Sequence, residues 1–206
     1  MRMTLSSFNR RPMKPSKTLA RGDREATVIA VAAQKGGVGK TTTSVTLASA
    51  WARFHDKRVL LVDLDPQANV NLALRAQIQL GGGALSDLLT EGRGTEVAEI
   101  ATTTLIDGLD VTPPDPGLLQ AENRMASRIG KELVLRTALE HSRTHYDLIV
   151  LDCPPNIGTL TINALVAADR VLVPCNPAAL AVAGVSGIFQ TIEEVRGQLN
   201  PGLDML

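Results

Sequence analysis

The sequence predicts an α/β fold in which a mostly parallel central β-sheet carries helices on both faces. From Thr27 onward, short apolar runs alternate with longer helical segments, as in repeated βαβ units. The runs are rich in β-branched residues and leucine, which is typical of strands that are buried on both faces. Charged or glycine-rich clusters follow three of the runs, at the sheet edge where such folds bind ligands.

The elements follow one another in a regular order along the chain. Strands are expected at residues 27–33, 58–63, 109–112, 147–152 and 170–174. Helices fill the gaps, at residues 40–55, shortly after Pro66, and at 86–91, 117–127, 131–143, 159–168 and 183–199. The glycines at 81–83 and the proline-rich segment 112–117 indicate loops. No internal repeat is present.

The composition indicates one globular domain with an aliphatic core. The chain has 206 residues, 44% of them hydrophobic and only 2% aromatic, so stacking platforms for single-stranded nucleic acid are not expected. No apolar run reaches the length of a membrane span, and the first residues do not resemble a signal peptide. Two cysteines are too few for a disulfide scaffold, and we expect a cytoplasmic location.

The charge is unevenly distributed, although the formal net charge is zero. Residues 1–25 contain seven basic and two acidic side chains, a net charge of about +5, which leaves about −5 for the remainder. We therefore divide the chain into a basic, disordered N-terminal tail (1–25) and a nucleotide-binding domain (26–206). The tail is either an electrostatic contact for DNA, anionic lipid or an acidic partner, or a solvated leader without a specific role.

A phosphate-binding loop follows the first expected strand. Its glycines allow successive backbone N–H groups to face one anion, and the following helix adds its positive dipole end. The ε-ammonium group of Lys40 is expected on the β- and γ-phosphates and the Thr41 hydroxyl on Mg²⁺. The expected nucleotide-binding residues are Lys35, Gly36, Gly37, Val38, Gly39, Lys40, Thr41 and Thr42.

The loop departs from the common phosphate-loop pattern at its first positions. Gln34 occupies the place of the first glycine, and Lys35 adds a second lysine that its own site does not need. A second lysine in a positive loop is costly unless it meets another anion. We therefore expect Lys35 to reach the nucleotide of a facing copy, the alternative being an exposed loop lysine.

Three aspartates complete the expected site. Asp152 ends an apolar strand, where a metal and its water shell would justify a carboxylate, although it could also be a helix cap. Asp63 and Asp65 are two residues apart on an extended chain, so both side chains are expected on one side. Mg²⁺ would supply their counter-charge, and one of them could orient the attacking water; simple turn chemistry is the alternative.

The three motifs resemble those of the ParA family of partition ATPases. The family belongs to the deviant Walker A class of P-loop NTPases, together with the MinD proteins and the nitrogenase iron protein. The resemblance is carried by the loop at 35–43, the segment 59–69 with its Asp-x-Asp-Pro-Gln ending, and the segment 146–155 with Asp-Cys-Pro-Pro. It continues through 158–169 and covers most of residues 27–190.

The resemblance implies a Mg²⁺-dependent ATPase that forms a homodimer around ATP. Such a protein binds DNA without sequence preference in its ATP state, is associated with the nucleoid, and is released when a ParB-like or other adaptor stimulates hydrolysis. By position, the catalytic residues would be Lys35, Lys40 and Asp65, with Lys35 crossing the dimer. Thr41, Asp63 and Asp152 would surround the metal.

Two departures and two rival functions remain open. The segment 176–184 lacks the acidic and aromatic residues common in the family, and relatives usually continue beyond Leu206, so the resemblance implies a chain without its C-terminal portion. One rival is a MinD-like regulator whose hydrolysis controls membrane binding. The other is a nucleotide-binding protein that has lost turnover, which the intact Asp63, Asp65 and Asp152 argue against.

Overall fold

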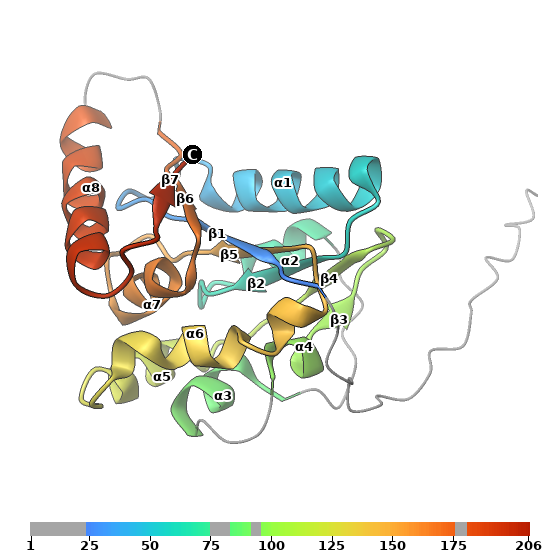
Figure 1. The fold of residues 1–206 in the computed structure, drawn as a ribbon, viewed down its shortest axis with the longest axis horizontal. Coiled ribbons are helices and arrows are strands. Elements are labelled where there is room, and N and C mark those ends of the chain that lie inside the picture. The colour runs from blue at the N-terminus through green and yellow to red at the C-terminus, as the bar shows by residue number, and fades with distance from the viewer. Residues whose placement is uncertain (1–23, 75–82, 92–95, 176–180) are drawn as a thin grey trace, which may run out of the picture.

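The computed structural model describes residues 24–74, 83–91, 96–175 and 181–206. Within these residues the chain forms a seven-stranded sheet of order β3-β4-β2-β5-β1-β6-β7. All neighbouring strands are parallel except β3, which runs antiparallel to β4 at one edge. The predicted α/β fold with a mostly parallel central sheet is therefore confirmed (Figure 1).

Strong β-formers build the strands. Strands β2, with the sequence VLLVD, and β5 are buried at every position because helices cover both faces of the sheet. The strands are β1 (Thr27–Val31), β2 (Val59–Asp63), β3 (Thr102–Thr103), β4 (Leu109–Val111), β5 (Leu148–Asp152), β6 (Arg170–Leu172) and β7 (Asp204–Met205).

Eight α-helices and two 3₁₀ turns are present in the described residues. The helices are α1 (Lys40–His55), α2 (Asn69–Leu74), α3 (Leu85–Glu91), α4 (Val97–Ile100), α5 (Leu118–Met125), α6 (Val134–Leu139), α7 (Thr159–Ala167) and α8 (Ala181–Gln198). The 3₁₀ turns are Lys131–Leu133 and Ser142–Thr144.

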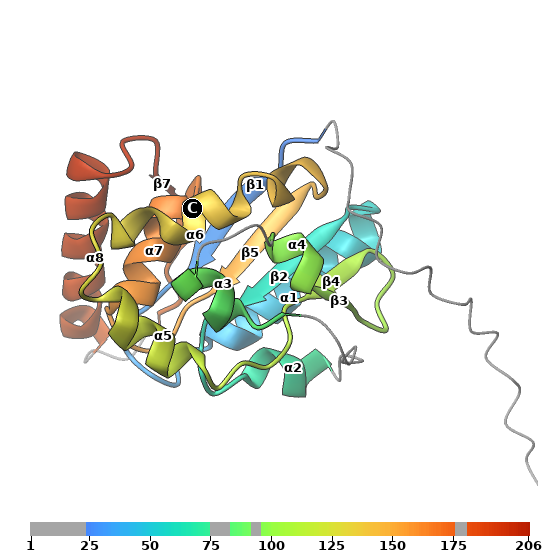
Figure 2. The same ribbon diagram turned by 90° about the horizontal axis from the view of Figure 1, so that it is seen from below.

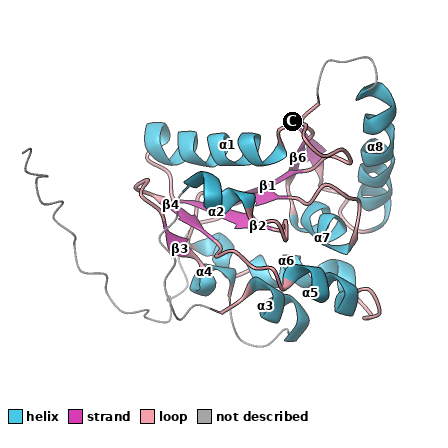
Figure 3. Cartoon of the chain, turned by 180° about the vertical axis from the view of Figure 1, so that it is seen from behind, coloured by secondary structure: helices cyan, strands magenta, loops and turns pink. Residues whose placement is uncertain are grey.

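The helices cover the sheet unequally. Helices α1 and α2 pack on one face, where Ala48 of α1 and Val70 of α2 belong to one buried cluster with side chains of β1, β2 and β5. Side chains of α3 to α8 fill the other face in a larger aliphatic cluster. Figures 1 and 3 show this division, with α1 along one side of the sheet and α3 to α6 opposite. Seen from below, α3 to α6 lie across the sheet (Figure 2).

Several expected boundaries were wrong. The helix expected over 131–143 is divided into a 3₁₀ turn, α6 and a second 3₁₀ turn. One reason is Asn163 of α7, whose side-chain oxygen accepts a hydrogen bond from the Leu135 N–H at 3.1 Å and so caps the new helix. Three short elements, α4, β3 and β7, were not predicted. Strands β1, β4 and β6 end one or two residues earlier than expected, whereas β2 and β5 end at the expected residues, Asp63 and Asp152.

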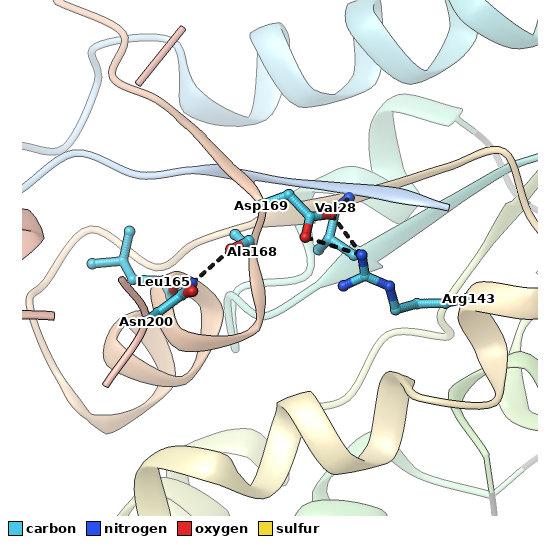
Figure 4. Close-up of polar contacts among 6 residues, drawn as sticks. All are labelled: Val28, Arg143, Leu165, Ala168, Asp169 and Asn200. Carbon is cyan, nitrogen blue, oxygen red and sulfur yellow. Dashed lines mark hydrogen bonds and ion pairs between the residues drawn. The ribbon is translucent and has the colours of Figure 1, made fainter. Parts of the chain in front are cut away.

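Side-chain contacts fix the start of β6 between α7 and β1 (Figure 4). Asp169 accepts a hydrogen bond from the Val28 N–H at 2.7 Å and pairs with the Arg143 guanidinium at 2.8 Å. The side-chain amide of Asn200 donates to the carbonyls of Leu165 and Ala168, which are the unpaired groups at the end of α7. The segment after α8 is thereby attached to the sheet.

Some predictions fall on residues that the structure does not describe. Residues 1–23 of the expected disordered tail, most of the 81–83 glycine loop and most of the divergent 176–184 segment lie outside the described residues. The loop at 112–117 is confirmed and contains no helix or strand.

Candidate functional site

The three predicted clusters meet at one edge of the sheet. In the register of the sheet, Asp152 at the end of β5 lies beside Val31 of β1 on one side and Asp63 of β2 on the other. The phosphate loop, the Asp63–Asp65 segment and Asp152 are therefore neighbours, although they are far apart in the sequence. The predicted convergence at the carboxyl ends of the strands is confirmed.

The phosphate loop has the backbone that its glycines allow. Gly37 and Gly39 have φ angles of 73° and 91°, in the region that L side chains rarely adopt. Helix α1 begins directly after Gly39, so its unpaired N–H groups and its positive dipole end open into the loop. Val38 is partly buried, and Thr42 in the first turn of α1 is exposed. This arrangement suits a phosphate chain.

The two lysines of the loop have different surroundings. Lys40 is buried, with 7% of its surface exposed, and its ammonium group donates to the carbonyl of Lys35 at 3.3 Å. The Lys35 side chain is exposed and makes no hydrogen bond or ion pair with another described residue. Lys40 therefore faces the interior of the loop, and Lys35 extends from the surface beside it.

Two hydroxyl groups of α1 hold the carboxylate of Asp152. Thr41 Oγ1 donates to Oδ2 at 2.8 Å, and Ser44 Oγ donates to Oδ1 at 2.7 Å. Asp152 is completely buried. Burial raises the pKa of Asp152, the hydrogen bonds from Ser44 and Thr41 lower it, and the charge of Asp65 raises it again.

Asp63 is the most perturbed carboxylate of the cluster. Its Oδ1 accepts the Asp65 N–H at 3.1 Å, and its own N–H donates to the Thr112 hydroxyl at 2.9 Å. Its Oδ2 is buried and accepts no hydrogen bond from the described residues. Burial raises the pKa of Asp63 to about 7, the Asp65 N–H opposes this, and the charges of Asp152 and Asp65 add to it.

Asp65 belongs to a tight turn above Asp63. Its Oδ1 accepts the Gln67 N–H at 3.0 Å, and its carbonyl accepts the Ala68 N–H at 2.9 Å. Ala68 has a φ of 53°, the left-handed conformation that leads into α2. Asp65 thus contributes to the charge cluster, while turn hydrogen bonds set the position of its carboxylate.

The donor set fits a hydrated Mg²⁺ ion. Asp63 Oδ2 is a buried carboxylate oxygen in need of a partner, and the Thr41 hydroxyl lies beside Asp152. Mg²⁺ prefers such oxygen ligands and usually retains water and phosphate oxygens. Within the described residues, no group of three His, Cys, Asp or Glu side chains could hold a metal ion by itself.

Three polar residues of the site were not predicted. Ser44 follows Thr41 by one helical turn, and this spacing could have identified it. Thr112 directly follows β4, so the expectation that functional residues lie at the carboxyl ends of the strands applied to it as well. Asn71 of α2 donates to the Thr112 carbonyl at 3.0 Å, and no sequence signal indicated this contact.

Gln34, in the place of the usual first glycine, contacts α8. A Cβ atom at Gly187 would lie 2.2 Å from its Oε1 and 3.0 Å from its Cδ. A side chain at position 187 would therefore require the Gln34 side chain to move. The entry to the phosphate loop therefore packs directly against the backbone of α8.

The chain is similar to known proteins over most of its length. The sequence model of the AAA domain family matches residues 26–205. The sporulation initiation inhibitor protein Soj of Bacillus subtilis is 41% identical over 176 residues, which are 85% of this chain and 68% of Soj. The chromosome partitioning protein ParA of Myxococcus xanthus is 41% identical over 178 residues, 86% of this chain and 62% of that protein. The chain thus spans about two thirds of the length of these relatives.

Solved structures give the same result. Cobyrinic acid a,c-diamide synthase of Mycobacterium smegmatis, solved with bound ADP and magnesium, matches with a TM-score of 0.79 at 36% identity. The match covers 87% of this chain and 72% of the synthase chain. A plasmid partition protein of Borrelia burgdorferi matches with a TM-score of 0.74 at 27% identity. This match covers 89% of this chain and 77% of the partition protein. The chain belongs to the ParA family of P-loop partition ATPases.

Proposed function

We propose that this ParA-family ATPase acts as a switch in chromosome or plasmid partition, or in the positioning of another cargo. ATP joins two subunits, the dimer binds DNA, and hydrolysis dissolves the complex. The observation that carries the proposal is Lys35, an exposed cation without a partner among the described residues, beside a site that is otherwise complete. A second nucleotide, bound by a facing copy, is the anion that explains it.

The residues of one chain have distinct tasks in ATP hydrolysis. The loop N–H groups and Lys40 hold the β- and γ-phosphates, and the buried position of Lys40 keeps its charge away from bulk water. Thr41, Asp63 and Asp152 would hold Mg²⁺, which neutralises charge on the phosphates when bound. Asp65 orients the water that attacks the γ-phosphorus, and its turn hydrogen bond keeps the carboxylate in place.

Dimerisation adds the remaining charge. Lys35 of each copy would reach the phosphates of the other and stabilise the negative charge that develops as the bond to the leaving ADP oxygen breaks. ATP binding and association are then one event. Loss of the γ-phosphate removes the anion that Lys35 contacts, and the dimer separates.

The DNA and adaptor steps rest on family membership and on the charge of the chain. Residues 1–25 have a net charge of about +5, and such a segment favours phosphate-rich surfaces such as the nucleoid. A ParB-like or other adaptor would stimulate hydrolysis. No helix in the described residues is long and apolar enough to cross a membrane.

Two substitutions test the dimer. Asp65→Ala should block hydrolysis and hold the ATP-bound protein as a dimer in size-exclusion chromatography; a variant that binds ATP but remains monomeric would refute the proposal. Lys35→Ala should lose both dimerisation and turnover, whereas Lys57→Ala, at the opposite edge of the sheet, should retain both. Normal turnover in Lys35→Ala would show that this lysine has no catalytic task.

DNA binding requires a separate assay. We expect ATP-dependent binding of mixed-sequence DNA that weakens steeply as salt increases, and weaker binding after removal of residues 1–25. ATP-dependent binding to anionic vesicles instead of DNA would indicate a MinD-like regulator. Binding of ATP without hydrolysis or any change in association would contradict both functions.

A further inference from the structure

Ser44 occupies a position in the site that the motifs do not explain. It lies in α1, four residues after Lys40 and three after Thr41, and it is completely buried. Its hydroxyl is 3.0 Å from the Lys40 carbonyl and 2.7 Å from Asp152 Oδ1. The first contact is common for a serine within a helix. The second is shorter and joins the serine to a buried carboxylate, so it is a charge-assisted hydrogen bond.

With this contact, both oxygens of the Asp152 carboxylate are hydrogen-bonded to α1. Thr41 occupies Oδ2 and Ser44 occupies Oδ1, so each carboxylate oxygen has one hydroxyl donor from the same helix. Asp152 also lies in register with Asp63, and the charge of Asp65 disfavours the ionised form of Asp152. Without Ser44, only Thr41 would oppose rotation of the carboxylate, and Thr41 is the residue that would also contact the metal.

We propose that Ser44 is a positioning residue for the magnesium site. By holding Oδ1, it fixes the plane of the Asp152 carboxylate and keeps Oδ2 paired with the Thr41 hydroxyl. Ser44 itself does not touch nucleotide or metal; it acts through Asp152. The inference rests on the metal assignment made under the proposed function and on hydrogen bonds that the structure contains without any ligand.

The variant Ser44→Ala removes the hydroxyl and adds no volume. The readout is the Mg²⁺ concentration that gives half-maximal Mg²⁺-dependent binding of a fluorescent ATP analogue, measured in the presence of excess analogue. We expect this concentration to rise about tenfold. This is the lower end of the range for loss of a residue that hydrogen-bonds to a metal ligand. Binding of the analogue in EDTA should not change, because the loop and Lys40 remain intact.

Matched controls separate positioning from stability. Thr46→Ala removes an exposed hydroxyl from the same helix and should leave the Mg²⁺ dependence unchanged. Ser44→Thr retains a hydroxyl that can donate to Asp152 Oδ1, so its half-saturating Mg²⁺ should stay within about threefold of wild type even if the added methyl lowers its melting temperature.

A second measurement needs neither metal nor activity. In EDTA, urea unfolding of Ser44→Ala, Asp152→Asn and the double variant should give effects that are not additive, since the two residues share one hydrogen bond. A wild-type Mg²⁺ requirement in Ser44→Ala, or additive unfolding effects, would overturn the proposal. If nucleotide binding by the wild type does not depend on Mg²⁺, the metal assignment is refuted instead. If the wild type remains a monomer in the presence of ATP, the proposed ATP-dependent dimer is refuted.

Discussion

Asp63→Asn tests the electrostatics of the site without any ligand. Asp63 is 2% exposed, and its Oδ2 lacks a hydrogen bond from the described residues. Its pKa is raised from 3.8 to about 7, mainly by burial. The folded protein therefore binds this proton more tightly than the unfolded chain, so ionised Asp63 opposes folding. An asparagine retains the oxygen that accepts the Asp65 N–H and removes the charge.

The sign and the magnitude follow from the two pKa values. Between about pH 4 and about pH 7 the folded state holds a proton that the unfolded state has lost, so this group lowers stability as the pH rises. At about 1.4 kcal/mol per pH unit, the cost is roughly 2 kcal/mol at pH 5 and roughly 4 kcal/mol at pH 8. The stability advantage of Asp63→Asn over wild type should increase by about 2 kcal/mol between these conditions.

Urea unfolding in EDTA at about pH 5 and about pH 8 measures this difference. Asp107→Asn is the control, because Asp107 is exposed and lies at the other edge of the sheet. Its stability difference from wild type should not depend on pH. If the advantage of Asp63→Asn is the same at both pH values, Asp63 is not a strained carboxylate, and the reasoning that assigns it to the metal loses its physical support.

Three further predictions concern the scaffold around the site. Asn163→Ala should lower the unfolding free energy by about 1 to 3 kcal/mol in urea titrations, because it leaves the buried Leu135 N–H without its acceptor; a loss below about 0.5 kcal/mol would contradict this. Gly39→Ala, at a φ of 91°, should weaken binding of an ATP analogue by at least about tenfold, and unchanged affinity would show that the loop tolerates a side chain. Burial lowers the pKa of His145 in the folded protein, so the wild type should lose stability as the pH falls below about 6.5, and His145→Gln should lose less; equal losses in pH-dependent unfolding would exclude His145 as the cause.

The sequence predicted the site better than the short elements. Asp63 and Asp152 are recognisable because each ends an unbroken apolar strand, and this local pattern also sets their place at the sheet edge. By contrast, β3 and β7 contain two residues each, too few for any periodicity. The break in the helix expected over 131–143 depends on Asn163, which approaches from another helix.

Long-range contacts limited the prediction of the site in the same way. Thr41 and Asp152 are 111 residues apart, and their pairing could be expected only because both belong to a known arrangement. Ser44 has no such motif, and its role depends on which face of α1 meets β5. That face is determined by the packing of Ala48 and Ala52 on the sheet, which is a tertiary contact and cannot be predicted from the helix sequence alone.

The position of β5 has a consequence for synthesis of the chain. Strands β1 and β2 are made first, but they do not pair with each other; each pairs with β5, which lies between them. A growing chain that has not yet released residues 148–152 therefore lacks the strand that joins its phosphate loop to Asp63. We therefore expect ATP to stabilise the chain only after its central strand is inserted.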